Sequence, residues 1–423
     1  MTAVLAVVIF VGAFVLLATD KVHRTKVALV GAGLMLLLNI TDAEHAFYDV
    51  ETAVDWNVVF LLLGMMVIVS VLRQTGIFEY IAILAAKRSR GRPYRLMVML
   101  CVLTAVASAV LDNVTTVLLI APVTFLVCER LGLKPVPFLI AEIMASNIGG
   151  TATLVGDPPN IIIASRGGLT FNDFLVHLLP WVVFLMIVFC LMCRWLFRSA
   201  FSFDPDRVES VMSLNEREAI KDTRLLVKCG VVLAMVVAAF VLHPVLHYEP
   251  SVVALLGAGL LVLITNVTTE DALKEVEWPT LVFFAGLFVM VGSLVETGVI
   301  GKVSEALTGA TDGREGLTAM VLLFGSAGLS AIVDNIPYVA TMSPVVATLV
   351  PNDGPNVLWW ALALGADLGG NATAIGASAN VVVLGIAERA GHPIGFWQFT
   401  KYGIVVTVVT ISLSAPYLWL RYL

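Results

Sequence analysis

Charged residues are scarce in this chain of 423 residues, since Asp, Glu, Lys and Arg together make up 13%, against about 25% in typical soluble proteins. Apolar residues make up 59%, whereas soluble domains contain roughly 45–50%. These proportions exclude a soluble globule and predict an all-α protein that crosses a membrane many times. The first apolar run, residues 3–19, lacks a preceding basic segment and is long enough to span, so it predicts a transmembrane helix and not a cleaved signal.

Cysteine is also rare, and its placement excludes a disulfide framework. All five cysteines lie in or beside apolar runs. Cys190 and Cys193 form a C-x-x-C pair inside WVVFLMIVFCLMCRWLF, where inert buried thiols are expected in place of a metal or redox site. Because a membrane protein's net charge of −6 says little about partners, the partner that we expect is the lipid bilayer. We expect no nucleic-acid partner, no enzymatic activity and no cofactor other than a coupling ion.

Apolar runs divide the chain into ten predicted transmembrane segments and two re-entrant hairpins. The hairpins, 96–128 and 316–350, have polar tips, DNVTT at 112–116 and DNIPY at 334–338. Their arms of about 14–18 residues are short for a bilayer, which needs about 20. The predicted transmembrane segments are 3–19, 26–41, 56–72, 136–165, 173–197, 225–242, 251–267, 279–296, 357–386 and 402–420.

Lysine and arginine set the predicted orientation, because cytoplasmic segments are enriched in both. With ten crossings and two hairpins, just four of the 25 basic residues (Arg166, Lys302, Arg314 and Arg421) lie outside. Both termini are then predicted to lie outside a plasma membrane. The basic segment KRSRGRPYR at 87–95 is expected to meet anionic lipid headgroups.

An internal repeat is the most informative feature of the chain. VALVGAGL at 27–34 recurs as VALLGAGL at 253–260, and WNVVFLLLGMMVIVSVLRQTG at 56–76 aligns with 278–298. The hairpin tips and NIGGTATLVGDPPN at 147–160, which aligns with DLGGNATAIGASAN at 367–380, follow in the same order. The repeats are residues 1–198 and 225–423, joined by a polar cytoplasmic linker, 199–224. Because each contains five crossings, the second copy is predicted to be inverted, as in many secondary transporters.

Two of the predicted transmembrane segments, 136–165 and 357–386, contain stretches that a regular helix cannot accommodate. In the first, glycines and two prolines weaken or break the helix. Unwound backbone at membrane depth persists only where protein or a watery cavity satisfies it. The two unwound segments and the two hairpin tips are therefore predicted to converge on one small polar site.

Aspartates predict the chemistry of this site. Asp112, Asp157, Asp334 and Asp367 all fall in the four broken elements, whereas the motif blocks of these elements, 112–123, 147–160, 334–345 and 367–380, contain no lysine or arginine. An ionised aspartate at membrane depth costs at least about 2.5 kcal/mol, so a proton or a cation must neutralise it. The candidate sodium ligands are Asp112, Asn113, Asp157, Asp334, Asn335 and Asp367, and the remaining candidate site residues are Thr115, Asn147, Gly149, Gly150, Thr151, Asn160, Gly369, Gly370, Thr373, Ser378 and Asn380.

DNVTTVLLIAPV together with IAEIMASNIGGTATLVGDPPNIII resembles the ArsB/NhaD permeases of the ion transporter superfamily, above all the bacterial relatives of the pigmentation P protein. The resemblance covers nearly the whole chain. It implies a fold like that of the CitMHS and dicarboxylate carriers, an elevator mechanism with scaffold and transport domains, and a homodimer. Related dicarboxylate carriers have Ser-Asn-Thr at the hairpin tips. Asp-Asn stands at those positions here, which argues against a dianionic substrate.

These observations favour a secondary active transporter of a small inorganic ion, coupled to protons or sodium, with ion/proton antiport as the first hypothesis. Export of arsenite or antimonite is the alternative, because Asn and Thr can hydrogen-bond neutral arsenous acid. A sodium-coupled citrate carrier, a passive anion channel and an intramembrane protease using the VGD motif at 155–157 are weaker alternatives. The sequence leaves the substrate, its direction of movement and any ATPase partner open.

Overall fold

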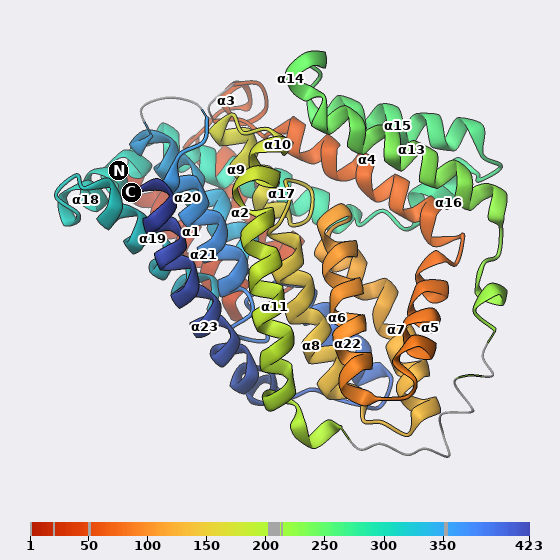
Figure 1. The fold of residues 1–423 in the computed structure, drawn as a ribbon. Helices are drawn as coiled ribbons and strands as arrows, with labels where there is room; N and C mark the ends of the chain where they lie inside the picture. The colour runs from red at the N-terminus through yellow and green to blue at the C-terminus, as the bar shows by residue number, and fades with distance from the viewer. Residues whose placement is uncertain (1, 20–21, 50–51, 202–211, 213–214, 351–353) are drawn as a thin grey trace.

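The protein is helical throughout the residues that its computed structural model describes, which are 2–19, 22–49, 52–201, 212, 215–350 and 354–423. No strand occurs among them, so the all-α prediction is confirmed. Figure 1 shows the helices and their order. They are α1 (Thr2–Thr19), α2 (Arg24–Leu37), α3 (Ala43–Phe47), α4 (Trp56–Arg73), α5 (Ile77–Ser89), α6 (Pro93–Val110), α7 (Asn113–Leu131), α8 (Pro135–Gly150), α9 (Pro158–Gly167), α10 (Phe171–His177), α11 (Leu179–Leu196), η1 (Arg198–Ala200), η3 (Glu216–Ala219), α13 (Thr223–Val241), α14 (His243–Leu246), α15 (Pro250–Ile264), α16 (Thr269–Lys274), α17 (Trp278–Glu296), α18 (Val299–Ala310), α19 (Glu315–Ser330), α20 (Asn335–Leu349), α21 (Val357–Gly369), α22 (Ser378–Arg389) and α23 (Phe396–Tyr422).

Eight helices of the described chain are long and apolar enough to cross a membrane: α1, α4, α6, α7, α11, α13, α17 and α23. Six of them match predicted crossings, and the chain is therefore a multi-pass membrane protein. The predicted crossings at α2 and α15 are shorter, at 14 and 15 residues. The full count of ten crossings stays a prediction.

The two predicted hairpins are pairs of helices, α6 with α7 and α19 with α20, joined by short turns. The expected arm lengths were wrong for the first hairpin. Its arms contain 18 and 19 residues, because helix extends beyond 96–128 at both ends. Length alone therefore no longer argues that the first hairpin is re-entrant, whereas the arms of the second, at 16 and 15 residues, are short.

Both predicted breaks in the long apolar segments are present. Helix α8 ends at Gly150 and α9 starts at Pro158, while α21 ends at Gly369 and α22 starts at Ser378. The segments 151–157 and 370–377 between them are turns and bends. Prolines at the first two positions of α9 lack the backbone donor that a continuous helix would require there.

Helices of the first repeat pack on helices of the second, and each such pair has an equivalent pair with the two repeats interchanged. Helix α4 packs on α15 and its counterpart α17 packs on α2, while α7 packs on α22 and α20 packs on α9; α4 and α15 lie side by side in Figure 1. Glycine permits the first two approaches. A Cβ on Gly64 would lie 2.6 Å from the carbonyl carbon of Ala254, and one on Gly286 would lie 2.9 Å from that of Ala28.

Two helices outside the predicted membrane segments also follow the repeat. Helices α5 and α18 begin after Gly76 and Gly298, which have φ angles of +77° and +74°. Glycine adopts this left-handed conformation without a steric penalty. The chain can therefore turn sharply at the end of α4 and again at the end of α17. Residues 202–211, 213 and 214 of the predicted linker, 199–224, lie outside the described residues. Its described end includes η3, which packs against α5 and pairs Glu216 with Lys87 at 2.6 Å.

Candidate functional site

The four broken elements meet in a cluster of buried amide and carboxylate side chains. Asn113, at the start of α7, donates from Nδ2 to Asp157 Oδ2 at 2.8 Å and to Asn147 Oδ1 at 3.2 Å. Asn335, at the start of α20, donates to the same Asp157 oxygen at 3.4 Å. All four side chains are at most 2% exposed. The structure therefore joins both hairpin tips to the first unwound segment.

The second unwound segment joins the cluster through Asn147. Its Nδ2 group donates to the Oδ1 atoms of Asn371 and Asn380, both at 3.0 Å. Asn371 was not among the predicted site residues, although it holds the repeat position of Thr151 and is fully buried. Its alignment with a predicted ligand is the signal that could have identified it.

Asp367 is the repeat counterpart of Asn147, but its surroundings differ. Its side chain is fully buried close to Thr151 and Asn160, which are the counterparts of Asn371 and Asn380. The Thr151 hydroxyl and the Asn160 amide donate to backbone carbonyls, so neither carboxylate oxygen of Asp367 has a partner with hydrogen-bond geometry within the described structure. Asn147 donates hydrogen bonds from its amide nitrogen to Asn371 and Asn380. The carboxylate of Asp367 has no donor group with which to make the equivalent bonds.

Hydrogen-bond acceptors outnumber donors in the cluster. Four buried oxygen atoms lack a partner in the described structure: Oδ1 of Asp157, Oδ1 of Asn160 and both carboxylate oxygens of Asp367. Among the donor groups of the cluster, Nδ2 of Asn371 also lacks a partner there. Asp157 lies within electrostatic range of the Asp367 carboxylate. Buried acceptors in excess and two nearby carboxylates require a proton or a cation to balance them.

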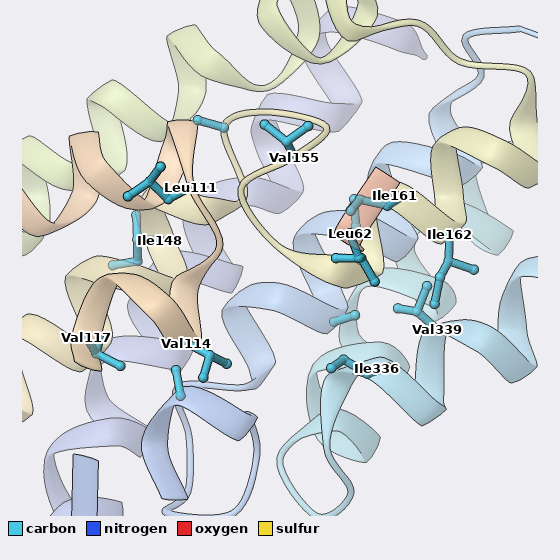
Figure 2. Close-up of a cluster of buried hydrophobic side chains, with 14 of the residues drawn as sticks. Leu62, Leu111, Val114, Val117, Ile148, Val155, Ile161, Ile162, Ile336 and Val339 are labelled. Atoms are coloured by element: carbon cyan, nitrogen blue, oxygen red, sulfur yellow. The ribbon is translucent and has the colours of Figure 1, made fainter. Parts of the chain in front are cut away.

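Apolar side chains enclose this region and keep water away from it. Figure 2 shows Val155 in the loop 151–157, with Leu111, Ile148 and Val114 on one side and Ile161 among the side chains on the other. All five are buried, with at most 6% exposure. A low-dielectric surrounding strengthens the interaction of the two carboxylates with any cation that enters.

Asp112 and Asp334 are placed differently from the expectation that all four acids meet at one point. Asp112 caps α7 by accepting from the backbone nitrogen of Thr115 at 2.7 Å and from its hydroxyl at 2.5 Å. Asp334 caps α20 by accepting from the backbone nitrogen of Ile336 at 3.0 Å. Both carboxylates still lie within electrostatic range of Asp157, so they contribute to the negative field while their oxygens serve as helix caps.

Asn160 and Asn380 hold the two unwound segments in shape. Asn160 donates to the carbonyls of Gly150 at 3.3 Å and Thr153 at 3.0 Å. Asn380 donates at 2.8 Å to the carbonyls of Gly370 and Thr373. These bonds satisfy carbonyl groups that a continuous helix would have paired.

Other predicted site residues have contacts with the neighbouring helices. A Cβ on Gly149 would lie 2.4 Å from Ala105, and one on Gly369 would lie 2.7 Å from Ala327, so these glycines permit close helix packing. The Thr373 hydroxyl donates to the carbonyl of Ala331 at 2.6 Å. The Thr151 hydroxyl donates to the carbonyl of Asn147 at 2.9 Å.

A basic side chain that the sequence did not predict approaches one edge of the site. The Arg24 guanidinium donates to the Ser378 hydroxyl and, at 3.0 Å, to Thr280 Oγ1. Ser378 in turn donates to Asp334. Arg24 therefore connects the start of α2 to the start of α22 and, through one hydroxyl, to a hairpin tip. Its repeat position is occupied by Pro250, so the repeat gave no signal for it.

Two cavities occupy equivalent places in the two repeats. A cavity of about 340 Å³ is lined in part by Leu61, Ile161, Glu249 and Pro250. A second, of about 240 Å³, is lined by the counterparts of these residues, namely Phe283, Val381, His23 and Arg24, and also by Asp334 and Ser378. The first cavity therefore has an acidic residue where the second has a histidine.

No group of three or more His, Cys, Asp or Glu side chains with the arrangement of a metal site occurs in the described part of the chain. Five free cysteines are present, of which four are buried and Cys190 is partly exposed.

The chain is similar over its full length to bacterial membrane proteins. It is 57% identical to the 46 kDa membrane protein of Mycobacterium leprae, covering 100% of this chain and 99% of that protein. It is 59% identical to an uncharacterized transporter of Mycobacterium tuberculosis, covering 99% of each. The P protein of Sus scrofa is 35% identical over 98% of this chain, which spans 59% of that longer protein. The expected relationship to the P protein is confirmed, whereas narrower placement among the ArsB/NhaD permeases stays a prediction.

A solved structure shares the fold. The YdaH transporter of Alcanivorax borkumensis matches with a TM-score of 0.53 and 16% identity, over 100% of this chain and 99% of that one. The model of the citrate transporter family, CitMHS, matches residues 14–365, which is most of the chain. The chain is therefore a membrane transporter and belongs to the citrate transporter family.

Proposed function

We propose that this protein is a secondary active transporter that couples the movement of a small inorganic ion to sodium or protons, with ion/proton antiport as its mode. The coupling site is the pair of buried carboxylates, Asp157 and Asp367, with the amides of Asn113, Asn147 and Asn371 around them. The observation that carries the proposal is the excess of buried, unpartnered oxygen atoms at these residues.

The proposed coupling follows from charge balance. A bound cation or a proton satisfies the free oxygens of Asp157 and Asp367, and its loss leaves two carboxylates repelling each other in apolar surroundings. The loaded and the unloaded site therefore differ in free energy. A transporter can use that difference to favour one arrangement of its helices over another.

Alternating access is supported by the internal repeat. We propose that the two repeats run in opposite directions through the membrane, so that their equivalent cavities open on opposite sides of it. The exchange of equivalent helix contacts, α4 with α15 and α17 with α2, supports this arrangement. Inverted repeats, an elevator movement, a homodimer and a plasma-membrane location with both termini outside form parts of the same proposal.

Citrate or another di- or tricarboxylate is the second candidate substrate. The match to the citrate transporter family and the position of Arg24 in the wall of a 240 Å³ cavity favour it, because a guanidinium group binds carboxylates well. Asp334 in the same wall opposes it. Sodium or proton binding at Asp157 and Asp367 is compatible with either substrate.

Reconstituted protein tests both the coupling and the substrate. Proteoliposomes are assayed for electrical current and internal pH change with sodium, lithium, citrate and arsenite in turn. We expect a sodium- or proton-dependent flux with one substrate, and its loss in Asp157→Asn. The matched control is Glu305→Gln, which removes an exposed acid on α18. Undiminished ion-coupled flux in Asp157→Asn would exclude the proposed site.

A further inference from the structure

An apolar groove runs between α6, α8 and α11 on the membrane-facing surface of the first repeat. Its volume is about 480 Å³, within the range of about 300 to 1,000 Å³ common for ligand sites. Its exposed walls include Val102, Val106, Val183, Ile187 and Leu191, which are 45–61% exposed. Such a wall is suited to a hydrocarbon chain.

One end of this groove is basic and aromatic. Tyr94 lies in the groove wall and donates its hydroxyl to the carbonyl of Cys190 at 3.0 Å. The Arg194 guanidinium lies 5.8 Å from the centre of the Tyr94 ring. Trp195 beside it is 74% exposed, as expected for an aromatic residue at the membrane–water interface. Exposed arginines that flank this end in the sequence are Arg92, Arg95 and Arg198.

The Tyr94 end of the groove is closed by the chain itself in both repeats. The Phe201 ring lies 5.6 Å from the Tyr94 ring. In the second repeat Leu423, the counterpart of Phe201, lies 3.2 Å from the Cβ position of Gly316, the counterpart of Tyr94. Phe201 is not part of the groove wall, which runs from Tyr94 along α6 and α11.

We propose that the groove binds one anionic phospholipid. Its acyl chain lies along Val102, Val106 and Ile187, and Arg194 holds its phosphate with the flanking arginines. The long apolar wall of the groove fits an acyl chain, and its basic end fits an anionic headgroup. Cationic side chains at a membrane surface attract such headgroups. A neutral lipid shares the acyl chain but not the charge.

The bound lipid would stabilise the unwound segment of the candidate site through α6. The floor of the groove includes Ala105, Ala109 and Gly149. The carbonyl of Ala109 accepts from the Thr153 hydroxyl at 2.5 Å, and the Ser108 hydroxyl donates to the carbonyl of Ser146 at 2.8 Å. Helix α6 therefore contacts both the groove and the unwound segment, so a lipid that packs on α6 would add to the contacts that hold this helix in place.

Native mass spectrometry of the full chain in detergent tests the binding directly, without any transport assay. The probes are dioleoylphosphatidylglycerol and dioleoylphosphatidylcholine, each titrated separately. We expect one retained phosphatidylglycerol, bound more tightly than phosphatidylcholine. Arg194→Gln should weaken it about fivefold, the equivalent of about 1 kcal/mol for one basic residue near an anionic surface. Lys302→Gln, at an exposed lysine on α18, is the control.

Filling the groove provides a second test. Val106→Trp and, independently, Val183→Trp should displace the lipid, because both positions are more than half exposed in its wall. Val231→Trp, at a similarly exposed position on α13, should retain it. Equal retention of the two lipids, or full retention of phosphatidylglycerol in both tryptophan variants, would overturn the proposal. A changed oligomeric state with unchanged lipid retention would assign the groove to a second copy of the chain instead.

Discussion

Asn147 and Asp367 hold the same position in the two repeats, but their side chains have opposite hydrogen-bonding states. Asn147 donates to Asn371 and Asn380 and accepts from Asn113. Both oxygens of Asp367 are buried without a hydrogen-bond partner in the described structure. One half of the site is therefore satisfied by its own amides, whereas the other half keeps two carboxylate oxygens without a donor in the described structure.

Asp367→Asn should convert the second half-site into a copy of the first. Its new amide nitrogen supplies the missing donor, so we expect a folded protein whose stability no longer depends on sodium or on pH near neutrality. The native protein should gain about 2.7 kcal/mol at a sodium concentration 100 times its dissociation constant. Thermal unfolding in sodium chloride and in choline chloride, at equal ionic strength, measures both effects.

The same comparison identifies the coupling ion. If sodium stabilises the native protein at constant pH, the site binds sodium, whereas a response to pH alone indicates a proton. Glu305→Gln should respond as the native protein does, because Glu305 is exposed on α18. A sodium response that survives in Asp367→Asn would show that the ion binds elsewhere.

The glycines at the crossings of α4 with α15 and of α17 with α2 are predicted to be sensitive to any added side chain. Gly64→Ala and Gly286→Ala each place a Cβ within 3 Å of backbone atoms of the neighbouring helix. Overpacking of this kind typically costs about 1–3 kcal/mol, so the temperature of unfolding should fall.

The matched controls lie in the partner helices of the same crossings. Gly33 in α2 and Gly259 in α15 have no atom within 4 Å of the Cβ position. Alanine there should raise stability slightly, by about 0.5–1 kcal/mol, because alanine favours the helix over glycine. Equal effects at all four positions would contradict the predicted close approach.

The repeat explains how much of this arrangement the sequence could predict. Similar blocks in the same order showed which residues are equivalent, and the structure brings the predicted residues Asn113, Asn147, Asp157 and Asn335 together in one buried cluster. A repeat cannot show how equivalent helices contact each other, however. The exchange of partners between α4 and α17 depends on packing that no linear pattern records.

Residues that break the repeat were harder to predict. Arg24 faces Ser378 from a helix 354 residues away in the chain, and no local motif surrounds it. Asp112 and Asp334 fit the usual N-cap pattern of helices as well as the pattern of an ion ligand. Their sequence could not separate the two roles, because both require a short carboxylate at the same position.

Arg24→Gln should open the contact between α2 and α22. The variant loses the charged bonds to Ser378 and Thr280, and charge-assisted bonds are stronger than neutral ones. We expect accessibility to increase in the cavity of about 240 Å³. A cysteine at Val382 in the lining, in an otherwise cysteine-free protein, should then react faster with a charged thiol reagent.

Arg24→Lys keeps the positive charge but not the two-nitrogen geometry of the guanidinium, so an intermediate rate is expected. A cysteine at Ile161, in the repeat-related cavity, serves as the control site and should be slower or unchanged when Arg24 is replaced. Equal acceleration at both cavities would indicate general loosening of the fold and not a local contact.

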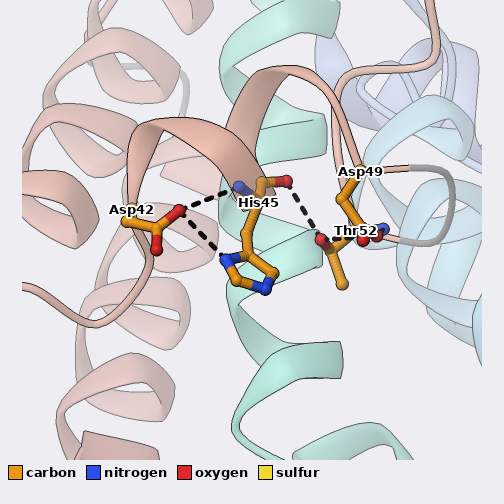
Figure 3. Close-up of polar contacts among 4 residues, drawn as sticks. All are labelled: Asp42, His45, Asp49 and Thr52. Carbon is orange, nitrogen blue, oxygen red and sulfur yellow. Dashed lines mark hydrogen bonds and ion pairs between the residues drawn. The ribbon is translucent and has the colours of Figure 1, made fainter.

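The pKa of His45 is expected to be raised, since its imidazole interacts with Asp42. His45 lies in α3, outside the candidate membrane spans, and its Nδ1 is 3.0 Å from Asp42 Oδ1 (Figure 3). The hydrogen bond to Asp42 raises the pKa of His45 above its ordinary value of 6.5. The stabilising contribution is therefore fully present below pH 6.5 and is lost as the pH rises through the folded-state pKa.

NMR titration of the His45 ring measures this shift. Asp42→Asn should lower the pKa of His45 towards 6.5, because it removes the charge as well as the principal acceptor. Glu296→Gln is the control, since Glu296 contributes a smaller, purely electrostatic effect. The loop itself should keep its shape in both variants, because Thr52 bonds independently to the His45 carbonyl at 3.0 Å and to Asp49 (Figure 3). An unchanged titration in Asp42→Asn would mean that Asp42 does not set the protonation of His45.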